Sequence, residues 1–162
     1  MSTLVTGIFK SRIAAEQAAD DLKQAGFSPA DVSLLMSETT RGREFAVERS
    51  TKAPEGAAAG ATIGGVIGAI AGGLAAIGTL AVPGLSLVAA GPIVAALTGL
   101  GAGAATGGAT GALIGLGIPE HEAKFYDEEI NRGGILVGVY SHKDQVKNAK
   151  EILDAAGADK VT

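Results

Sequence analysis

Few residues in this chain have the type and spacing that chemistry requires. His121-Glu122 opens a helical pattern, but Phe125 stands where an H-E-x-x-H zinc motif has its second His, and His142 lies at another helix start. We therefore predict no metal site and assign both His residues to solvated helix ends. The chain contains no Cys, which excludes thiolate catalysis, disulfides and Cys-ligated metals.

Two adjacent acidic pairs, Asp20-Asp21 and Glu128-Glu129, could in principle act as acid and base. Neighbouring residues on a helix point in different directions, so we predict solvated helix faces instead. Gly133-Gly134 follows a helix and precedes a strand, the reverse of a phosphate-binding loop, and is interpreted as a cap. We predict no catalytic residue, no cofactor and no enzymatic activity.

Phe9 and Tyr140 lie in matching strand patterns, as the base-stacking aromatics of RNA-binding sheets do. They have no basic neighbours, and the net charge is −4 without a basic cluster. Packing or a subunit contact is therefore favoured, and nucleic acid is not expected as a partner. No small-molecule substrate is indicated.

The elements that would position these residues form two similar halves. Residues 4–9 predict a strand, a helix follows from Ser11 to a cap at Gly26, and residues 31–36 predict a second strand. An offset of 131 residues repeats the pattern. It aligns Gly7 with Gly138, Phe9 with Tyr140, Ala18 with Ala149, Leu22 with Leu153 and Gly26 with Gly157.

The repeated half has a predicted strand at 135–140, a helix beginning at Ser141 and a short strand at 159–162. A further helix begins at Pro119 and ends at Arg132-Gly133. We predict an α+β fold, a ferredoxin-like β-α-β plus β-α-β sandwich with a long inserted helical hairpin. The predicted parts are 1–36 (first half), 37–53 (charged linker), 54–118 (glycine-zipper hairpin) and 119–162 (helix and second half, completing one composite domain with 1–36).

The insertion contains an uncharged stretch, residues 56–119, without Asp, Glu, Lys, Arg or His. Glycine recurs there every fourth residue in two runs, and residues four apart share one helix face, so each run can form a groove for close helix contact. We predict helix packing and homo-oligomerisation through Gly56, Gly60, Gly64, Gly68, Gly72, Gly99, Gly103, Gly107, Gly111 and Gly115.

Proline positions and the break at Val82-Pro83-Gly84 predict helices at 54–80 and 92–117. Each would be about 39 Å long, enough to cross a hydrocarbon core of about 30 Å. The stretch therefore predicts a transmembrane pair in the cytoplasmic membrane, with lipid as a partner. Two spans place both flanks on one side, and basic residues between 41 and 52 mark that side as cytoplasmic, in agreement with the absence of a secretory signal in residues 1–10. The turn 79–91 carries no charge or aromatic anchor, which leaves a cytoplasmic soluble oligomer as the alternative.

The chain resembles the bacterial general stress proteins, the heat-induced or low-temperature-induced proteins with a central glycine-zipper segment. The resemblance lies in AVPG, AAGPIVAALTG, GIPEHEAKFYDEEINRGG and the following ILVGVY, behind GIFKSRIAAEQAADDLKQAGF, and it covers nearly the whole chain. It implies a stress-associated, non-enzymatic role and brings no catalytic residues.

Three functions remain open. The first is a stress-response protein that associates with membrane and self-assembles through its zippers. The second is a soluble homo-oligomer whose hairpins form a shared apolar core, because an exposed apolar surface of this size would aggregate. The third is a small-ligand sensor, which rests only on analogy with other ferredoxin-like folds.

Overall fold

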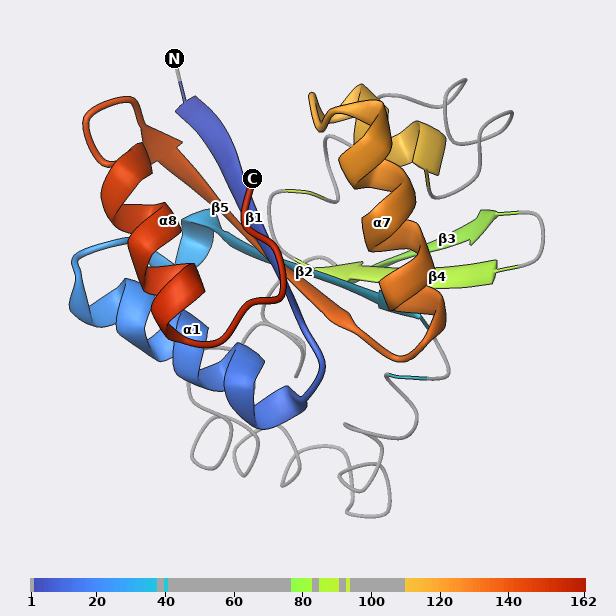
Figure 1. The fold of residues 1–162 in the computed structure, drawn as a ribbon, viewed down its shortest axis with the longest axis horizontal. Coiled ribbons are helices and arrows are strands. Elements are labelled where there is room, and N and C mark those ends of the chain that lie inside the picture. The colour runs from blue at the N-terminus through green and yellow to red at the C-terminus, as the bar shows by residue number, and fades with distance from the viewer. Residues whose placement is uncertain (1, 38–39, 41–76, 83–84, 91–92, 94–109) are drawn as a thin grey trace.

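The computed structural model describes residues 2–37, 40, 77–82, 85–90, 93 and 110–162 and has an α+β fold, as the sequence predicts. Its five-stranded antiparallel sheet has the order β1-β5-β2-β4-β3 (Figure 1). The elements are β1 (Ser2–Phe9), α1 (Arg12–Gln24), a 3-10 turn (Pro29–Asp31), β2 (Val32–Ser37), β3 (Ile77–Val82), β4 (Leu85–Ala90), α7 (Glu120–Asn131), β5 (Ile135–His142) and α8 (Val146–Ala155).

Strand β5 lies between the two strands that come from the N-terminal part of the chain. It pairs with β1 along its whole length, from Ser2 opposite His142 to Phe9 opposite Ile135. On its other side β5 pairs with β2. Segments far apart in the sequence are therefore neighbours in one sheet.

The segment after α8 pairs with the outer side of β1. Val161 forms an antiparallel bridge with Gly7, and Thr6 and Thr162 exchange two backbone hydrogen bonds of 2.9 Å. The short strand predicted at 159–162 is therefore reduced to a single bridge at Val161, with backbone hydrogen bonds to β1 on either side of it.

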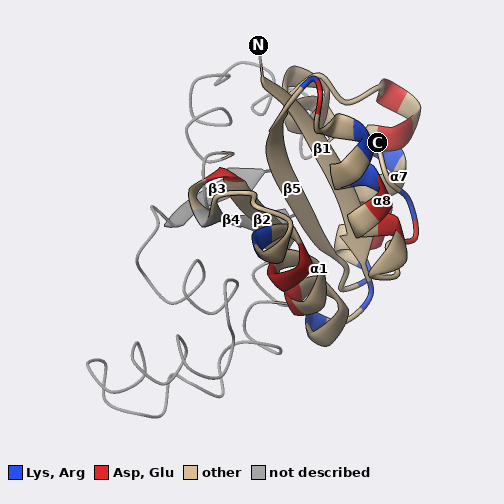
Figure 2. Cartoon of the chain, turned by 90° about the vertical axis from the view of Figure 1, so that its left-hand side faces the viewer, with Lys and Arg blue, Asp and Glu red and all other residues tan. Residues whose placement is uncertain are grey.

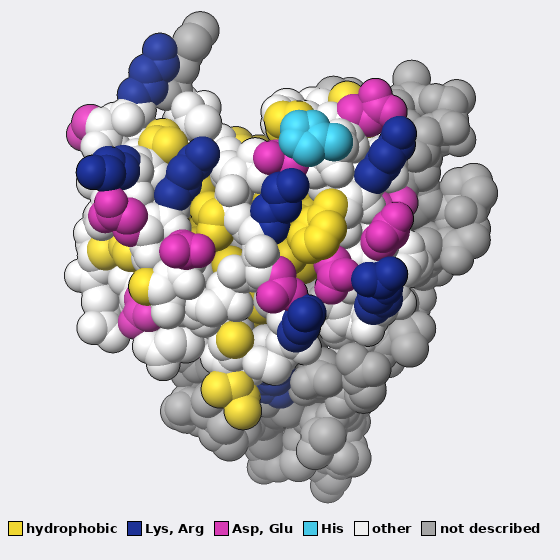
Figure 3. Space-filling model, viewed as in Figure 1, with side chains coloured by type: hydrophobic (Ala, Val, Ile, Leu, Met, Phe, Trp, Pro, Cys, Tyr) yellow, Lys and Arg dark blue, Asp and Glu magenta, His cyan; other side chains and the backbone are white. Residues whose placement is uncertain are grey.

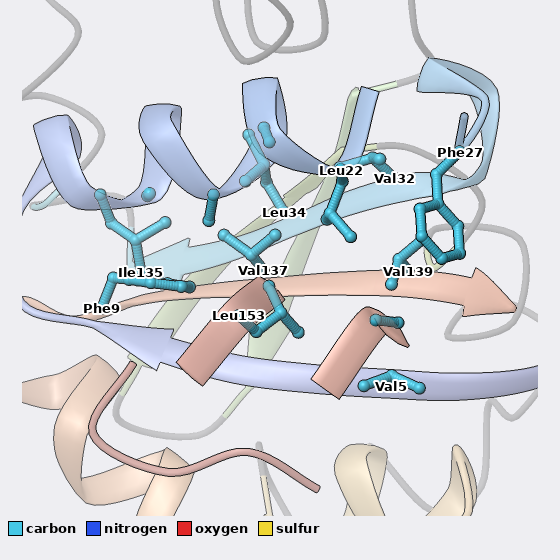
Figure 4. Close-up of a cluster of buried hydrophobic side chains, with 14 of the residues drawn as sticks. Val5, Phe9, Leu22, Phe27, Val32, Leu34, Ile135, Val137, Val139 and Leu153 are labelled. Atoms are coloured by element: carbon cyan, nitrogen blue, oxygen red, sulfur yellow. The ribbon is translucent and has the colours of Figure 1, made fainter. Parts of the chain in front are cut away.

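One face of the sheet is covered by α1 and α8, which lie on the opposite side of β5 from α7 in Figure 1. Alternate strand residues supply this core, as expected where successive side chains point to opposite faces. The buried set, most of it drawn in Figure 4, includes Val5, Phe9, Leu22, Val32, Leu34, Ile135, Val137, Val139 and Leu153.

The other face is covered by α7 and by the residues that lead into it, with a helical segment at 110–115. The strand residues on this face are those between the members of the first core, such as Ile8, Leu35 and Leu136. Ala123, Tyr126 and Ile130 of α7 pack on them at helical spacing. The helix predicted from Pro119 is thus confirmed, and it closes a second core.

The helix ends follow local rules that the sequence predicts. The Ser11 hydroxyl accepts a hydrogen bond from the Ala14 amide at the start of α1. Gly26 and Gly157 each have φ +94° directly after α1 and α8, a conformation that side chains disfavour. The repeat is therefore present at the C-terminal ends of the two helices, whereas α8 has no side-chain cap at its start.

The predicted start of the last helix at Ser141 is wrong. Ser141 is buried and pairs with Thr3 inside β5, and the strand continues to His142. Helix α8 begins only at Val146. Pairing along the full length of β1 extends β5 past the position where the repeat predicts a helix.

The predicted helix at 54–80 is also wrong at its end, because Ile77–Val82 is strand β3, paired residue by residue with β4. Strand β4 in turn pairs with β2, from Leu34 opposite Ala90 to Ser37 opposite Leu87. A transmembrane hairpin would place 79–91 on the far side of the bilayer, yet this segment shares a sheet with the flanks.

The prediction of transmembrane helices is accordingly contradicted. Within the part of the chain that the structure describes, no helix is both long and apolar enough to span a bilayer. Of the predicted helix at 92–117, the described portion is helical at 110–115 and ends before Gly117, which has φ +91°. Of the linker predicted at 37–53, Ser37 belongs to β2 and Thr40 is described; the rest of the linker and the first predicted helix up to residue 76 lie outside the described residues.

Candidate functional site

The described residues place most of their charge on the helices. Figure 2 shows Lys, Arg, Asp and Glu gathered on α1, α7 and α8. On the face of Figure 3, basic and acidic side chains alternate without a large patch of one sign. The densest polar arrangement lies where α7 meets β1 and the segment after α8, and we take it as the candidate site.

Tyr126 is at the centre of this site. Its side chain is fully buried, and its hydroxyl accepts a hydrogen bond from the Thr6 hydroxyl at 3.3 Å. The same hydroxyl donates toward Thr162 Oγ1 at 3.0 Å, with the carbonyl oxygens of Thr6 and Lys160 each 3.4 Å away. One tyrosine therefore joins a helix, a strand and the segment after α8.

The chain of hydrogen bonds ends on a carboxylate. The Thr162 hydroxyl donates to Glu122 Oε2, one helical turn before Tyr126 on α7. Glu122 Oε1 lies 3.6 Å from His121 Nε2 and 4.0 Å from Lys160 Nζ. The Thr6 hydroxyl thus donates to Tyr126, the Tyr126 hydroxyl to Thr162, and the Thr162 hydroxyl to Glu122.

Lys160 completes the site from the segment after α8. Its Nζ atom lies 5.4 Å from the centre of the Phe125 ring, within the range of a cation–π contact. The Phe125 ring in turn lies 6.0 Å from that of Tyr126, tilted by 57°. Aromatic and charged contacts therefore hold the segment at the same place as the hydroxyl chain.

Burial raises the pKa of Tyr126, an effect that the hydrogen bonds with Thr162 and Thr6 reduce and the charge of Glu122 increases. The phenol is therefore neutral at neutral pH. A neutral, fully buried phenol with its hydrogen bonds satisfied serves as a connector, whereas a base or nucleophile needs an accessible ionised form.

The His residues predicted to be solvated lie in separate elements. His121 is exposed at the start of α7, as predicted. His142 is also exposed, but it is the last residue of β5, so its predicted place at a helix start is wrong. Across the described ranges, no three His, Asp or Glu side chains gather closely enough to hold a metal ion.

The acidic pairs behave differently from each other. Glu128 is exposed as predicted, but Glu129 is buried and forms a 2.9 Å ion pair with Arg132. The prediction of a solvated face fails at Glu129 because it lies three residues after Tyr126, on the buried side of α7. Asp21 accepts a 2.8 Å hydrogen bond from Gln17 on the surface of α1.

The remaining candidates are placed by the strands. Phe9 is buried in the core below α1, whereas Tyr140 is half-buried opposite Leu4, so they form no common stacking surface. Gly133 has φ +104°, and the Gly134 amide donates to the Glu129 carbonyl at 2.7 Å. The interpretation of this glycine pair as a helix cap is confirmed.

The glycines predicted to pack helices lie almost entirely outside the described residues. Gly111 and Gly115 are described; both belong to the helical segment 110–115, with Gly111 half-buried and Gly115 exposed. Thr110 at the start of this segment donates to Asp127 of α7 at 2.8 Å. This contact anchors the end of the uncharged stretch on α7.

Sequence reasoning did not anticipate the hydroxyl chain. Glu122 and Tyr126 stand four residues apart on a predicted helix, which is a detectable signal, but their partners Thr6 and Thr162 are contributed by distant segments. No family model, curated protein or solved structure matches this chain.

Proposed function

We propose that this chain is a non-enzymatic, self-assembling protein of the general stress type. In this proposal a folded α+β body holds the uncharged stretch, and copies of the chain bury that stretch against one another. The stress role rests on the resemblance of the sequence motifs. The self-assembly rests on the pattern of the uncharged stretch and on the way the body holds it.

The observation that carries the proposal is that strands from before, inside and after the uncharged stretch all belong to one sheet. Strand β2 precedes the stretch, β3 and β4 come from its middle, and β5 follows it after α7. The stretch is therefore tethered to a charged body at several points. A long uncharged sequence tethered in this way needs apolar partners, because exposed apolar surface promotes aggregation.

We further propose that residues 1–36 and 119–162 form one composite, ferredoxin-like domain. The order of the segment after α8, β1, β5 and β2, all antiparallel neighbours, supports this arrangement. The packing of α1 and α8 on the same face supports it as well. Strands β3 and β4 then extend the sheet beyond β2, and α7 covers the second face.

The assembly is tested by measuring the mass of the full chain by sedimentation equilibrium and native mass spectrometry over a range of concentrations. We expect an oligomer. Gly64→Leu combined with Gly107→Leu inserts large side chains where close helix contact is proposed and should disrupt it. Ile63→Leu with Ile70→Leu, which conserves volume, is the matched control and should assemble like the parent.

A parent chain that is monomeric at every concentration would contradict the self-assembly proposal. An oligomer that the glycine substitutions leave unchanged would retain self-assembly but exclude the zippers as its interface.

A further inference from the structure

The two edges of the sheet differ in how they are protected. At the β1 edge, the segment after α8 makes a single bridge and carries charged residues. Lys10 and Asp159 form a 3.1 Å ion pair there, and Lys160 follows directly. Short pairing and charged side chains are the usual means by which proteins prevent an edge from pairing with another chain.

Strand β3 forms the opposite edge. In the part of the chain that the structure describes, one side of β3 pairs with β4 and no strand pairs with the other side. In Figure 1 the β3–β4 hairpin extends away from α1 and α8. Among the described residues, none hydrogen-bonds as a strand to the backbone groups along the outer side of β3.

The sequence of β3 carries none of the protective features of the other edge. It reads IGTLAV, without a charged residue and without Pro. Its pairing with β4 is continuous from Ile77 to Val82, without a bulge that would twist the edge away. Six residues of strand extend about 20 Å, which is an ordinary length for a paired strand.

We propose that β3 pairs with β3 of a second copy of this chain, joining two five-stranded sheets into one continuous sheet. The proposal rests on the self-assembly proposed above and names one of its interfaces. A second copy fits because an antiparallel pair of identical strands obeys two-fold symmetry, so that each copy offers the complement of the other. The edge is uncharged, so pairing two copies brings no like charges together.

Symmetry also sets the register. A two-fold axis perpendicular to the sheet places residues of the same face opposite each other, so the pairing is centred on a residue, and Thr79 lies near the middle of β3. The two copies of Thr79 then lie opposite each other. Like charges at directly opposite positions destabilise a strand pair, and opposite charges stabilise it.

The test uses Thr79→Lys and Thr79→Glu in the full chain, with oligomer mass measured by native mass spectrometry. Each variant alone should give a smaller assembly than the parent. If the β3 pair joins two otherwise complete halves of the oligomer, the variant assembly should have half the parent mass. Mixing the two variants should restore the parent mass, with equal amounts of the two chains in each pair. Thr3→Lys, at an exposed position of β1, is the control and should keep the parent mass.

Restoration by mixing separates charge repulsion from misfolding, because a misfolded chain would not recover a partner. An oligomeric parent whose mass is unchanged in both Thr79 variants would overturn the β3 interface while leaving self-assembly intact. Reduced mass without restoration on mixing would also overturn it. A monomeric parent would overturn the self-assembly proposal itself.

Discussion

The hydroxyl groups of Tyr126 and Thr162 lie 3.0 Å apart and link α7 to the segment that bridges to β1. The Thr162 hydroxyl also donates a hydrogen bond to Glu122, so the same segment is bonded to the first turn of α7. A helix on one face of the sheet and a segment at its edge are thus held by one buried polar contact. Tyr126 also belongs to the second core, in which it packs with Ile8 of β1.

Removing the phenol oxygen should destabilise this junction. Tyr126→Phe keeps the buried ring but leaves the Thr6 and Thr162 hydroxyls without their shared partner. We expect a loss of about 1–3 kcal/mol in the free energy of unfolding, measured by urea denaturation. Tyr140→Phe is the control, because the Tyr140 hydroxyl makes no hydrogen bond to the described residues. Equal losses in the two variants would contradict a specific role for Tyr126.

The same residue should make the fold sensitive to alkali. An unfolded tyrosine ionises near pH 10, whereas burial raises the pKa of Tyr126 in the folded chain. The folded state then holds the proton more tightly, so this contribution to stability is full below pH 10 and is lost as the pH rises toward the folded pKa. Urea denaturation at pH 9 and pH 11 should show a smaller decrease for Tyr126→Phe than for the parent. An equal decrease would exclude Tyr126 as the source.

Two glycines that the repeat aligns should differ in their tolerance of a methyl group. A Cβ atom on Gly7 would lie 3.1 Å from Ala158 Cβ and 3.4 Å from Leu153 Cβ, which are fixed to the backbone. A Cβ atom on Gly138 would meet Leu4 Cδ1 at 3.1 Å, the end of a flexible side chain. Gly7→Ala should cost about 1–3 kcal/mol and Gly138→Ala distinctly less, as measured by thermal denaturation. The reverse order would contradict the packing of α8 on β1.

Local patterns explain why the helices and caps are predictable. Ser11 and Gly26 act through contacts within a few residues, and the positive φ of Gly157 repeats that of Gly26. The strands repeat less well. Gly7 lies toward α8 and Gly138 toward the other face, because odd-numbered residues of both strands face α1 and α8 and the offset of 131 is odd. The offset that aligns the helix ends therefore pairs strand residues that lie on opposite faces of the sheet.

The β3–β4 hairpin could not be predicted from local patterns. Residues 77–90 are apolar and uncharged, which suits a buried helix and a strand equally, and the decision depends on pairing with β2. The candidate site also depends on contacts between distant segments. Thr6, Tyr126 and Thr162 become neighbours only once β1, α7 and the last segment share one sheet.

The second core should contribute as much to stability as its burial indicates. Ile130 of α7 is fully buried against the sheet, whereas Ile13 of α1 is 79% exposed. Ile130→Ala leaves a cavity under α7 and should cost about 2–5 kcal/mol. Ile13→Ala makes the same chemical change on the surface and should stay within about 0.5 kcal/mol. The measurement is urea denaturation of both variants beside the parent. Similar small losses would mean that α7 does not pack on the sheet, and the candidate site, which depends on that packing, would then be wrong as well.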